Sequence, residues 1–375
     1  MIYKDFQGKQ LSALGLGCMR FPVIDGNTAQ IDEAKTAEMV DYAMKSGINY
    51  YDTAYGYHGG TSEPLMGKLL VKYPRESFYL ASKFPGYDVK NLQNKEQVFA
   101  SQLQRCQTEY FDFYLCHSVT DTNIDNYLDP QYGLLEYLKA EKAAGRIRHL
   151  GFSCHASLEQ MERFIVAAEG AMEFCQIQLN WLDWMLQDAK AKVEMLGRYG
   201  IPVWVMEPVR GGALAKLKDD YAARLQALAP DRSAPEWAFR FLQGLPGVTM
   251  TLSGMSNMEQ LQQNIATYAT AQPLGEAELA ELLAIGAEIA AQPTLPCTAC
   301  RYCTEYCPQQ LDIPKLIEIY NEEIFSGGYI LPQAVARIEA DKRPDACIGC
   351  QSCEAVCPQG IKIATAFADF CARMK

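Results

Sequence analysis

The chain has 375 residues, 49% of them hydrophobic, and carries a formal net charge of −11 at pH 7. That length suffices for one large and one small domain with buried cores, and the negative charge argues against nucleic-acid partners and anionic membrane surfaces. The N-terminus lacks the apolar stretch of a signal peptide, and no apolar run is long enough to span a membrane. We therefore expect a cytoplasmic protein.

Apolar, strand-like segments alternate with helical patterns over residues 1–285. The chain opens with a predicted β-hairpin, Tyr3 to Leu11, which turns at Gly8 and could close the bottom of a barrel. Eight segments with the character of buried strands follow: Leu14–Gly17, Ile48–Asp52, Phe78–Lys83, Phe111–His117, Ile147–Ser153, Phe174–Asn180, Pro202–Glu207 and Val248–Gly254. Helical patterns lie between them, at Ala34–Ser46, Gln160–Ala168, Ala189–Arg198 and Glu236–Phe241. This alternation predicts an α/β fold, a (β/α)₈ TIM barrel.

Polar side chains follow the ends of the predicted strands, which is where TIM barrels place their working residues. Asp52 and Tyr57 follow the second strand, Lys83 ends the third and His117 ends the fourth. A neighbouring lysine lowers the pKa of a tyrosine, and a carboxylate keeps that lysine charged and aimed. A histidine can polarise a carbonyl oxygen from the other side. Together these four residues predict a proton donor for the reduction of a carbonyl group.

The order and spacing of these residues resembles the aldo-keto reductase family over nearly all of residues 1–285. The segments that carry the resemblance are Asp52-Thr-Ala-x-x-Tyr57, Gly60-x-Ser62-Glu63, Ser82-Lys83, His117, Gly151-Phe-Ser153, Gln176–Asn180 and Gly254-x-Ser256-Asn257 with Asn264. The resemblance implies a small-molecule carbonyl substrate and a nicotinamide cofactor, NAD(H) or NADP(H). It also implies that Tyr57 is the general acid, that Lys83 and Asp52 tune it, and that His117 orients the carbonyl.

The resemblance further implies which residues bind the cofactor. Ser153 and Gln176 would hold the nicotinamide carboxamide. The loop of Val209, Arg210, Gly211 and Gly212 would wrap the pyrophosphate, and Gln263 and Asn264 would contact the adenine.

Three positions depart from the family pattern near this cofactor. Cys154 stands where the family usually has an asparagine, and Met206 followed by Glu207 stands where it often has an aromatic residue. The segment 253–264 contains no Arg or Lys that could meet a 2′-phosphate.

A second, smaller domain begins after a predicted linker at residues 287–296, which contains Pro293 and Pro296. We therefore divide the chain into 1–285 and 286–375. In the second part the pattern C-x-x-C-x-x-C-x-x-x-C-P occurs twice, at Cys297, Cys300, Cys303 and Cys307 and at Cys347, Cys350, Cys353 and Cys357. A helical pattern at Ile313–Phe325 lies between the copies and predicts a small, mainly helical ferredoxin-like domain.

This cysteine pattern is that of bacterial two-cluster ferredoxins, where three thiolates bind one [4Fe–4S] cluster and the fourth binds the other. We therefore expect Cys357 to join the first three cysteines of copy one, and Cys307 to join those of copy two. Zinc is the alternative, but zinc sites usually combine two C-x-x-C pairs or cysteine with histidine. The pattern favours two [4Fe–4S] clusters. Most of the remaining cysteines are expected to be buried thiols rather than disulfides.

Two functions remain open from the sequence. The first is nicotinamide-linked carbonyl reduction coupled to one-electron transfer through the clusters. The second is an electron-transfer module whose barrel no longer performs hydride transfer and docks a redox protein partner. A flavin, the usual converter between two-electron and one-electron carriers, could serve in either. Retention of all four strand-end residues favours the first.

Overall fold

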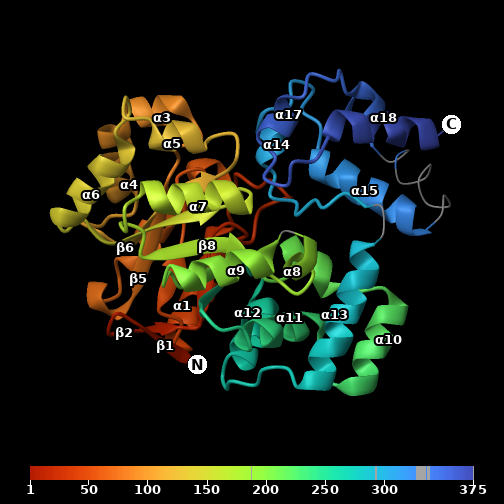
Figure 1. Ribbon diagram of the computed structural model, residues 1–375, viewed down its shortest axis with the longest axis horizontal. Helices are drawn as coiled ribbons and strands as arrows, with labels where there is room; N and C mark the ends of the chain where they lie inside the picture. The colour runs from red at the N-terminus through yellow and green to blue at the C-terminus, as the bar shows by residue number, and fades with distance from the viewer. Residues whose placement is uncertain (187, 292–293, 327–334, 336–337, 375) are drawn as a thin grey trace. The chain divides into compact units, whose positions relative to one another are not determined.

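The computed structural model describes residues 1–186, 188–291, 294–326, 335 and 338–374 (Figure 1). The chain divides into two compact units. The first comprises Met1–Val209 and Leu214–Gly286, and the second comprises Arg210–Ala213 and Ala287–Lys375. In the described residues, none of the helices combines the length and the apolar character needed to cross a membrane.

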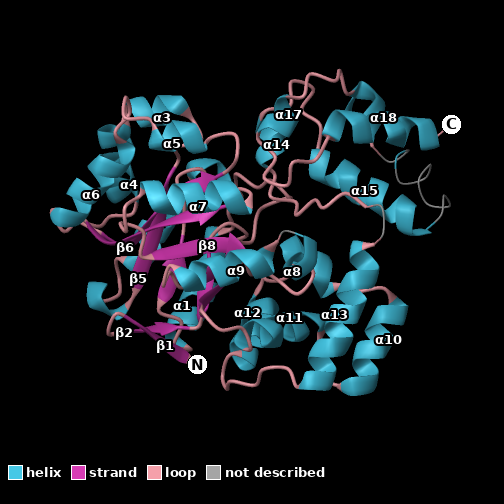
Figure 2. Ribbon diagram, viewed as in Figure 1, coloured by secondary structure: helices cyan, strands magenta, loops and turns pink. Residues whose placement is uncertain are grey.

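A closed barrel of eight parallel strands forms the centre of the first unit (Figure 2). The strands are β3 (Leu14–Gly17), β4 (Tyr50–Asp52), β5 (Tyr79–Phe84), β6 (Phe111–Val119), β7 (Ile147–Cys154), β8 (Phe174–Gln178), β9 (Val203–Met206) and β10 (Val248–Ser253). Each strand pairs with the next in chain order, and β10 closes the ring by pairing with β3. The predicted TIM barrel is therefore confirmed, with each predicted strand present and only its ends shifted.

The predicted hairpin forms from β1 (Tyr3–Phe6) and β2 (Lys9–Ser12), which pair antiparallel. Gly8 lies between them with a φ of 80°, a conformation that glycine adopts without steric cost. Phe6 is buried against aromatic residues of the barrel interior, with ring centroids 5.1 Å from Trp204 and 5.6 Å from Phe113. The hairpin thus closes the barrel with an aromatic plug, as expected.

Helices connect the strands and cover the outside of the barrel. They are α1 (Glu33–Lys45), α2 (Ser62–Leu70), α3 (Val89–Gln93), α4 (Lys95–Arg105), α5 (Ile124–Leu128), α6 (Leu134–Ala143), α7 (Leu158–Ala167), α8 (Asp183–Leu186), α9 (Ala189–Arg198), α10 (Asp219–Leu228), α11 (Ala234–Gln243), α12 (Met258–Thr267) and α13 (Glu276–Ala290). Asp32 caps α1 by accepting a hydrogen bond from the backbone N–H of Lys35, and buried Met39, Val40 and Ala43 face the barrel side of that helix.

The predicted linker begins too early. Helix α13 continues through Ala290, so the first residues of the predicted linker 287–296 are helical. The reason is composition, because residues 287–291 read Ala-Glu-Ile-Ala-Ala, which are helix-forming, and no proline stops the helix there. Pro293 lies outside the described residues.

The second unit consists, in its described part, of helices and loops (Figure 2). Its elements are α14 (Tyr302–Glu305), α15 (Ile313–Ser326), α17 (Ser352–Ala355) and α18 (Ile363–Arg373), with short 3₁₀ turns η4 (Ala340–Lys342) and η5 (Pro344–Ala346). The two cysteine runs share one backbone course. Arg301 and Gln351, each directly after the second cysteine, have left-handed φ values of 67° and 61°. Each precedes a short helix that carries the third, buried cysteine. The sequence repeat is thus also a structural repeat.

Candidate functional site

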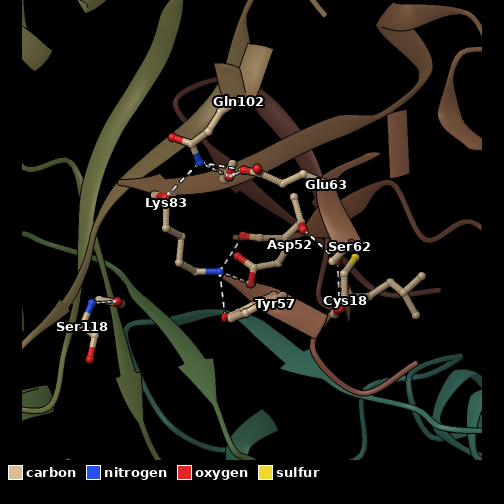
Figure 3. Close-up of polar contacts among 12 residues, drawn as sticks. Cys18, Asp52, Tyr57, Ser62, Glu63, Lys83, Gln102 and Ser118 are labelled. Carbon is tan, nitrogen blue, oxygen red and sulfur yellow. Dashed lines mark hydrogen bonds and ion pairs between the residues drawn. The ribbon is translucent and has the colours of Figure 1, made fainter. Parts of the chain in front are cut away.

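Lys83 lies at the centre of the candidate active site, near the carboxyl end of β5 (Figure 3). Its Nζ donates hydrogen bonds to Asp52 Oδ1 at 2.5 Å, to the backbone oxygen of Thr53 at 2.9 Å and to Tyr57 Oη at 3.1 Å. Its three donors therefore have three acceptors. The lysine is fully buried and Asp52 is 2% exposed. Because water is excluded from both groups, the ammonium and the carboxylate each need the other as a charge partner. The structure brings together the three residues as the sequence predicted.

His117 packs against the ring of Tyr57. The two rings meet edge to face, with centroids 5.8 Å apart. Burial lowers the pKa of His117 well below its usual range, and the positive charge of Lys83 and the nearby imidazole of His155 lower it further. The imidazole is therefore neutral at physiological pH and retains one ring N–H donor. A neutral donor suits a group that polarises a carbonyl oxygen.

The predicted lowering of the Tyr57 pKa is wrong, because the net shift is upward. Burial raises the pKa of Tyr57 well above its usual value, and electrostatic interactions with Asp52, Cys18, Tyr87 and Glu207 add to that effect. Burial also raises the pKa of Asp52, although Lys83 opposes it. The desolvation of a tyrosinate outweighs the neighbouring cation. Tyr57 thus retains its proton throughout the physiological pH range, as a proton donor must.

His58 is a buried residue whose role the sequence left open. It follows Tyr57 in the 3₁₀ turn η1 (Tyr57–Gly60) and adopts a left-handed φ of 55°. Its Nδ1 lies 2.6 Å from the carbonyl oxygen of Thr28, and its Nε2 accepts from the backbone N–H of Phe21 at 3.2 Å. The imidazole therefore fastens the turn that carries Tyr57 to the loop after β3. Only its position next to Tyr57 signalled this in the sequence.

Ser153 and Gln176 lie side by side as register partners on β7 and β8. Ser153 Oγ accepts from the backbone N–H of Ser118 at 2.7 Å, which leaves its own hydroxyl proton available to donate. Gln176 is 3% exposed, and among the described residues its Oε1 has no hydrogen-bond partner. A buried acceptor without a partner is costly, so a ligand N–H group is expected there. A hydroxyl donor beside an open amide acceptor fits the two ends of a nicotinamide carboxamide.

The other residues assigned to the cofactor lie on different elements. Asn264 on α12 is buried and donates to Ser253 Oγ at 3.2 Å, whereas Gln263 is exposed and donates to Glu259 at 3.1 Å. Gly211 and Gly212 have left-handed φ values of 66° and 102°. Arg210 is buried and donates to the carbonyl oxygen of Pro296 at 3.2 Å, within the second unit.

The eight motif cysteines gather in two sets, each around its own cavity in the second unit. One cavity is lined by Cys297, Cys300, Cys303 and Cys357. The other is lined by Cys307, Cys347, Cys350 and Cys353. The structure therefore places the fourth cysteine of each run with the first three of the other run. This is the exchange expected from the sequence for a pair of [4Fe–4S] clusters.

The chemistry and shape of each set fit a cluster. Aliphatic side chains complete the walls, Ile317 and Ile361 at one cavity and Leu311 and Phe367 at the other. Within the described ranges, no group of three His, Cys, Asp or Glu side chains is placed to hold a single metal ion. Burial and the neighbouring Cys347 and Cys307 together raise the pKa of Cys353 to about 11. A cysteine gives up its proton when it binds a metal, so each set of four cysteines could hold a cluster as thiolates.

Comparison with known proteins supports the interpretation of both the barrel and the cysteine-containing unit. Residues 13–286 match the Aldo/keto reductase family, and residues 296–361 match a 4Fe-4S dicluster domain. The chain is 27% identical to the uncharacterized oxidoreductase YqkF of Bacillus subtilis (strain 168) over 306 residues, which is 72% of this chain and 92% of that protein. It is 28% identical over 214 residues to the probable aldo-keto reductase 1 of Glycine max, covering 55% of this chain but only 58% of that protein.

A solved structure supports the same assignment. The holo form of aldo-keto reductase AKR11C1 from Bacillus halodurans superimposes with a TM-score of 0.61 at 25% identity, covering 74% of this chain and 93% of that one. The family match spans most of the chain, and the barrel and the strand-end residues belong to the same segment. The chain belongs to the aldo/keto reductase family and is an oxidoreductase that carries a C-terminal 4Fe–4S dicluster domain.

Proposed function

We propose that the barrel reduces a small aldehyde or ketone with a nicotinamide dinucleotide, and that two [4Fe–4S] clusters exchange single electrons with a redox protein. The observation that supports the barrel chemistry is the buried arrangement of Lys83 between Asp52 and Tyr57, with neutral His117 against the tyrosine ring. A bound reduced nicotinamide supplies the hydride. Ser153 and Gln176 would hold its carboxamide.

Side chains of the protein would bind the carbonyl oxygen of the substrate and protonate it. The hydroxyl of Tyr57 and the ring N–H of His117 donate hydrogen bonds to the carbonyl oxygen and thereby polarise it. As the oxygen gains negative charge, Tyr57 gives up its proton to form the alcohol. Lys83, 3.1 Å from the phenolic oxygen, stabilises the tyrosinate that is left. Asp52 fixes the ammonium in that position until solvent restores the proton.

The cluster sites supply a second chemistry. Cys297, Cys300, Cys303 and Cys357 would hold one cluster, and Cys307, Cys347, Cys350 and Cys353 the other. Each cluster transfers one electron, whereas a hydride carries two. A flavin would convert between the two, and we consider it the alternative to direct coupling with the dinucleotide.

Anaerobically purified protein tests this proposal. We expect it to oxidise NADH or NADPH in the presence of at least one member of a panel of aldehydes and ketones, such as 4-nitrobenzaldehyde. We also expect a broad visible absorbance that bleaches on reduction, as [4Fe–4S] clusters give. Structured flavin peaks in the spectrum would support the flavin alternative. Failure to reduce any carbonyl, with clusters present, would favour an electron-transfer module.

A further inference from the structure

A buried hydrogen-bond network lies directly behind the catalytic lysine, on the side away from Tyr57 (Figure 3). Its centre is Glu63, the second residue of α2, which is fully buried. Glu63 Oε1 accepts from Ser82 Oγ at 2.6 Å and from Gln102 Nε2 at 2.6 Å. Its Oε2 has a long contact, 3.5 Å, with Arg105. The short contacts of this carboxylate are therefore with the strand that carries Lys83 and with α4.

Gln102, on α4, contacts the backbone of the catalytic lysine itself. Its Nε2 also lies 3.0 Å from the carbonyl oxygen of Lys83 and 3.0 Å from Ser82 Oγ. Its Oε1 accepts from the hydroxyl of Tyr114 at 2.5 Å. Glu63 accepts from the amide nitrogen of Gln102, and Tyr114 donates to the amide oxygen. These two contacts orient the amide nitrogen toward the end of β5.

The neighbouring residue of α2 fixes the opposite side of the lysine. Ser62 Oγ lies 2.9 Å from Thr53 Oγ1 and donates to the backbone oxygen of Cys18 at 3.0 Å. The backbone oxygen of Thr53 is one of the three acceptors of the Lys83 ammonium. The first turn of α2 therefore connects the ends of β4 and β5, between which the ammonium is held, and also the residue after β3.

Packing of the protein core does not by itself require polar side chains at Glu63 and Gln102. Burial raises the pKa of Glu63, although hydrogen bonds from Ser82 and Gln102 oppose the effect, so the buried carboxyl group carries a desolvation cost. Apolar residues of similar volume often replace buried polar networks without loss of stability. What apolar residues cannot supply is a fixed direction for the backbone at Lys83.

We propose that Glu63 and Gln102 are positioning residues for carbonyl reduction, which hold the backbone of Ser82 and Lys83 so that the ammonium stays between Asp52 and Tyr57. This inference rests on the proposed role of Lys83 and Tyr57. Displacing a catalytic group by about 1 Å costs on the order of a hundredfold in rate. Loss of either residue should therefore lower kcat and leave KM for the carbonyl nearly unchanged.

Asp112 provides a matched control. It is also a buried carboxylate that holds β5, but at the other end, where its Oδ2 accepts from the backbone N–H of Leu80 at 2.9 Å and from Arg75 at 2.6 Å. Glu63→Leu and Asp112→Leu each remove a buried carboxylate that contacts the same strand, β5. We expect both to lower Tm, but only Glu63→Leu to lower kcat, by roughly tenfold to a hundredfold.

Two further variants separate positioning from general loss of structure. Glu63→Gln keeps an oxygen that can accept from Ser82 and Gln102, so it should recover most of the kcat lost in Glu63→Leu. Gln102→Met keeps the bond between Glu63 and Ser82 but removes the contact with the Lys83 carbonyl. It should lower kcat even if Glu63→Leu fails to fold.

The measurement is steady-state kinetics of the full-length holoenzyme with the carbonyl of the panel that it reduces fastest, with Tyr57→Phe alongside. Equal losses of kcat in Glu63→Leu and Asp112→Leu, or in Glu63→Gln and Glu63→Leu, would overturn the inference, as would an unchanged kcat in Gln102→Met. If Tyr57→Phe retains activity, the proposed function itself fails. If Tyr57→Phe is inactive while the Glu63 and Gln102 variants are active, only this inference fails.

Discussion

The two units of this chain differ in what surrounds their buried polar groups. In the candidate active site of the barrel, the buried ammonium of Lys83 has protein acceptors in Asp52, Thr53 and Tyr57. In the second unit, cysteines lie within the small apolar core, Cys303 and Cys353 among them, around cavities that protein atoms do not fill. We therefore expect the barrel to be preorganised by its own side chains, and the second unit to depend on its clusters for a complete core.

Removal of iron should cause the largest change in stability, and it should destabilise the second unit more than the barrel. Metal binding contributes directly to the folding of small metal-binding domains, so we expect chelation under anaerobic conditions to unfold the second unit while the barrel remains folded. Intact protein should contain about eight irons per chain. Iron analysis together with circular dichroism checks both statements. A value near four after careful anaerobic preparation, with one cysteine set empty, would contradict the assignment of two clusters.

The same contrast predicts how a shortened chain behaves. Because α13 runs through Ala290 and buries Leu282 and Ile285, the barrel should be ended after Ala291 rather than at the predicted boundary of 285. Such a chain should fold, bind dinucleotide and contain no iron. Dinucleotide fluorescence titration measures the binding. Loss of dinucleotide binding in a folded chain would mean that the cofactor site needs residues after Ala291.

Within the barrel, Tyr57→Phe tests whether the preorganised site performs the proposed chemistry. General acid catalysis contributes roughly a hundred- to ten-thousandfold, so kcat for carbonyl reduction should fall by that factor. Dinucleotide binding should change little, since the hydroxyl contacts Lys83 and not the proposed carboxamide site. Single-turnover reduction measured by absorbance provides the rate. A kcat within a few-fold of the wild type would exclude Tyr57 as the proton donor.

The sequence predicted the parts of the fold that follow regular patterns. Eight apolar strands, the hairpin at Gly8 and the repeated cysteine runs each depend on local spacing, and the structure contains all of them. The roles of Gln102 and His58 could not be predicted, because each depends on contacts across distant segments, such as that of Gln102 with the Lys83 carbonyl. The pKa of Tyr57 was misjudged for a related reason. A sequence shows which charges lie near a group, but not how completely water is excluded from it.

The dinucleotide preference should be a smaller effect. The segment after β10 contains no Arg or Lys between residues 253 and 264, and a charge-assisted hydrogen bond is worth about 1.5–3 kcal/mol. We therefore expect NADPH to bind less than tenfold more tightly than NADH. Fluorescence titration of both at the same ionic strength measures the ratio. A tenfold or greater preference for NADPH would show that a basic residue from another segment meets the 2′-phosphate.

The last prediction concerns the acid stability of the barrel. Burial lowers the pKa of His155 to about 4, and the charge of Lys192 contributes to the shift. Because the unfolded chain binds a proton near pH 6.5 and the folded chain does not, stability should fall as pH decreases from 6.5 toward 4. At pH 5 this single group should cost on the order of 1–2 kcal/mol of unfolding free energy.

His155→Gln removes the titration, so the variant should lose less stability than the wild type between pH 7 and pH 5. Urea unfolding of both proteins at the two pH values isolates this difference, since the other titrating groups are common to both. Equal losses would mean that His155 is protonated in the folded protein, and that water or a carboxylate reaches its ring.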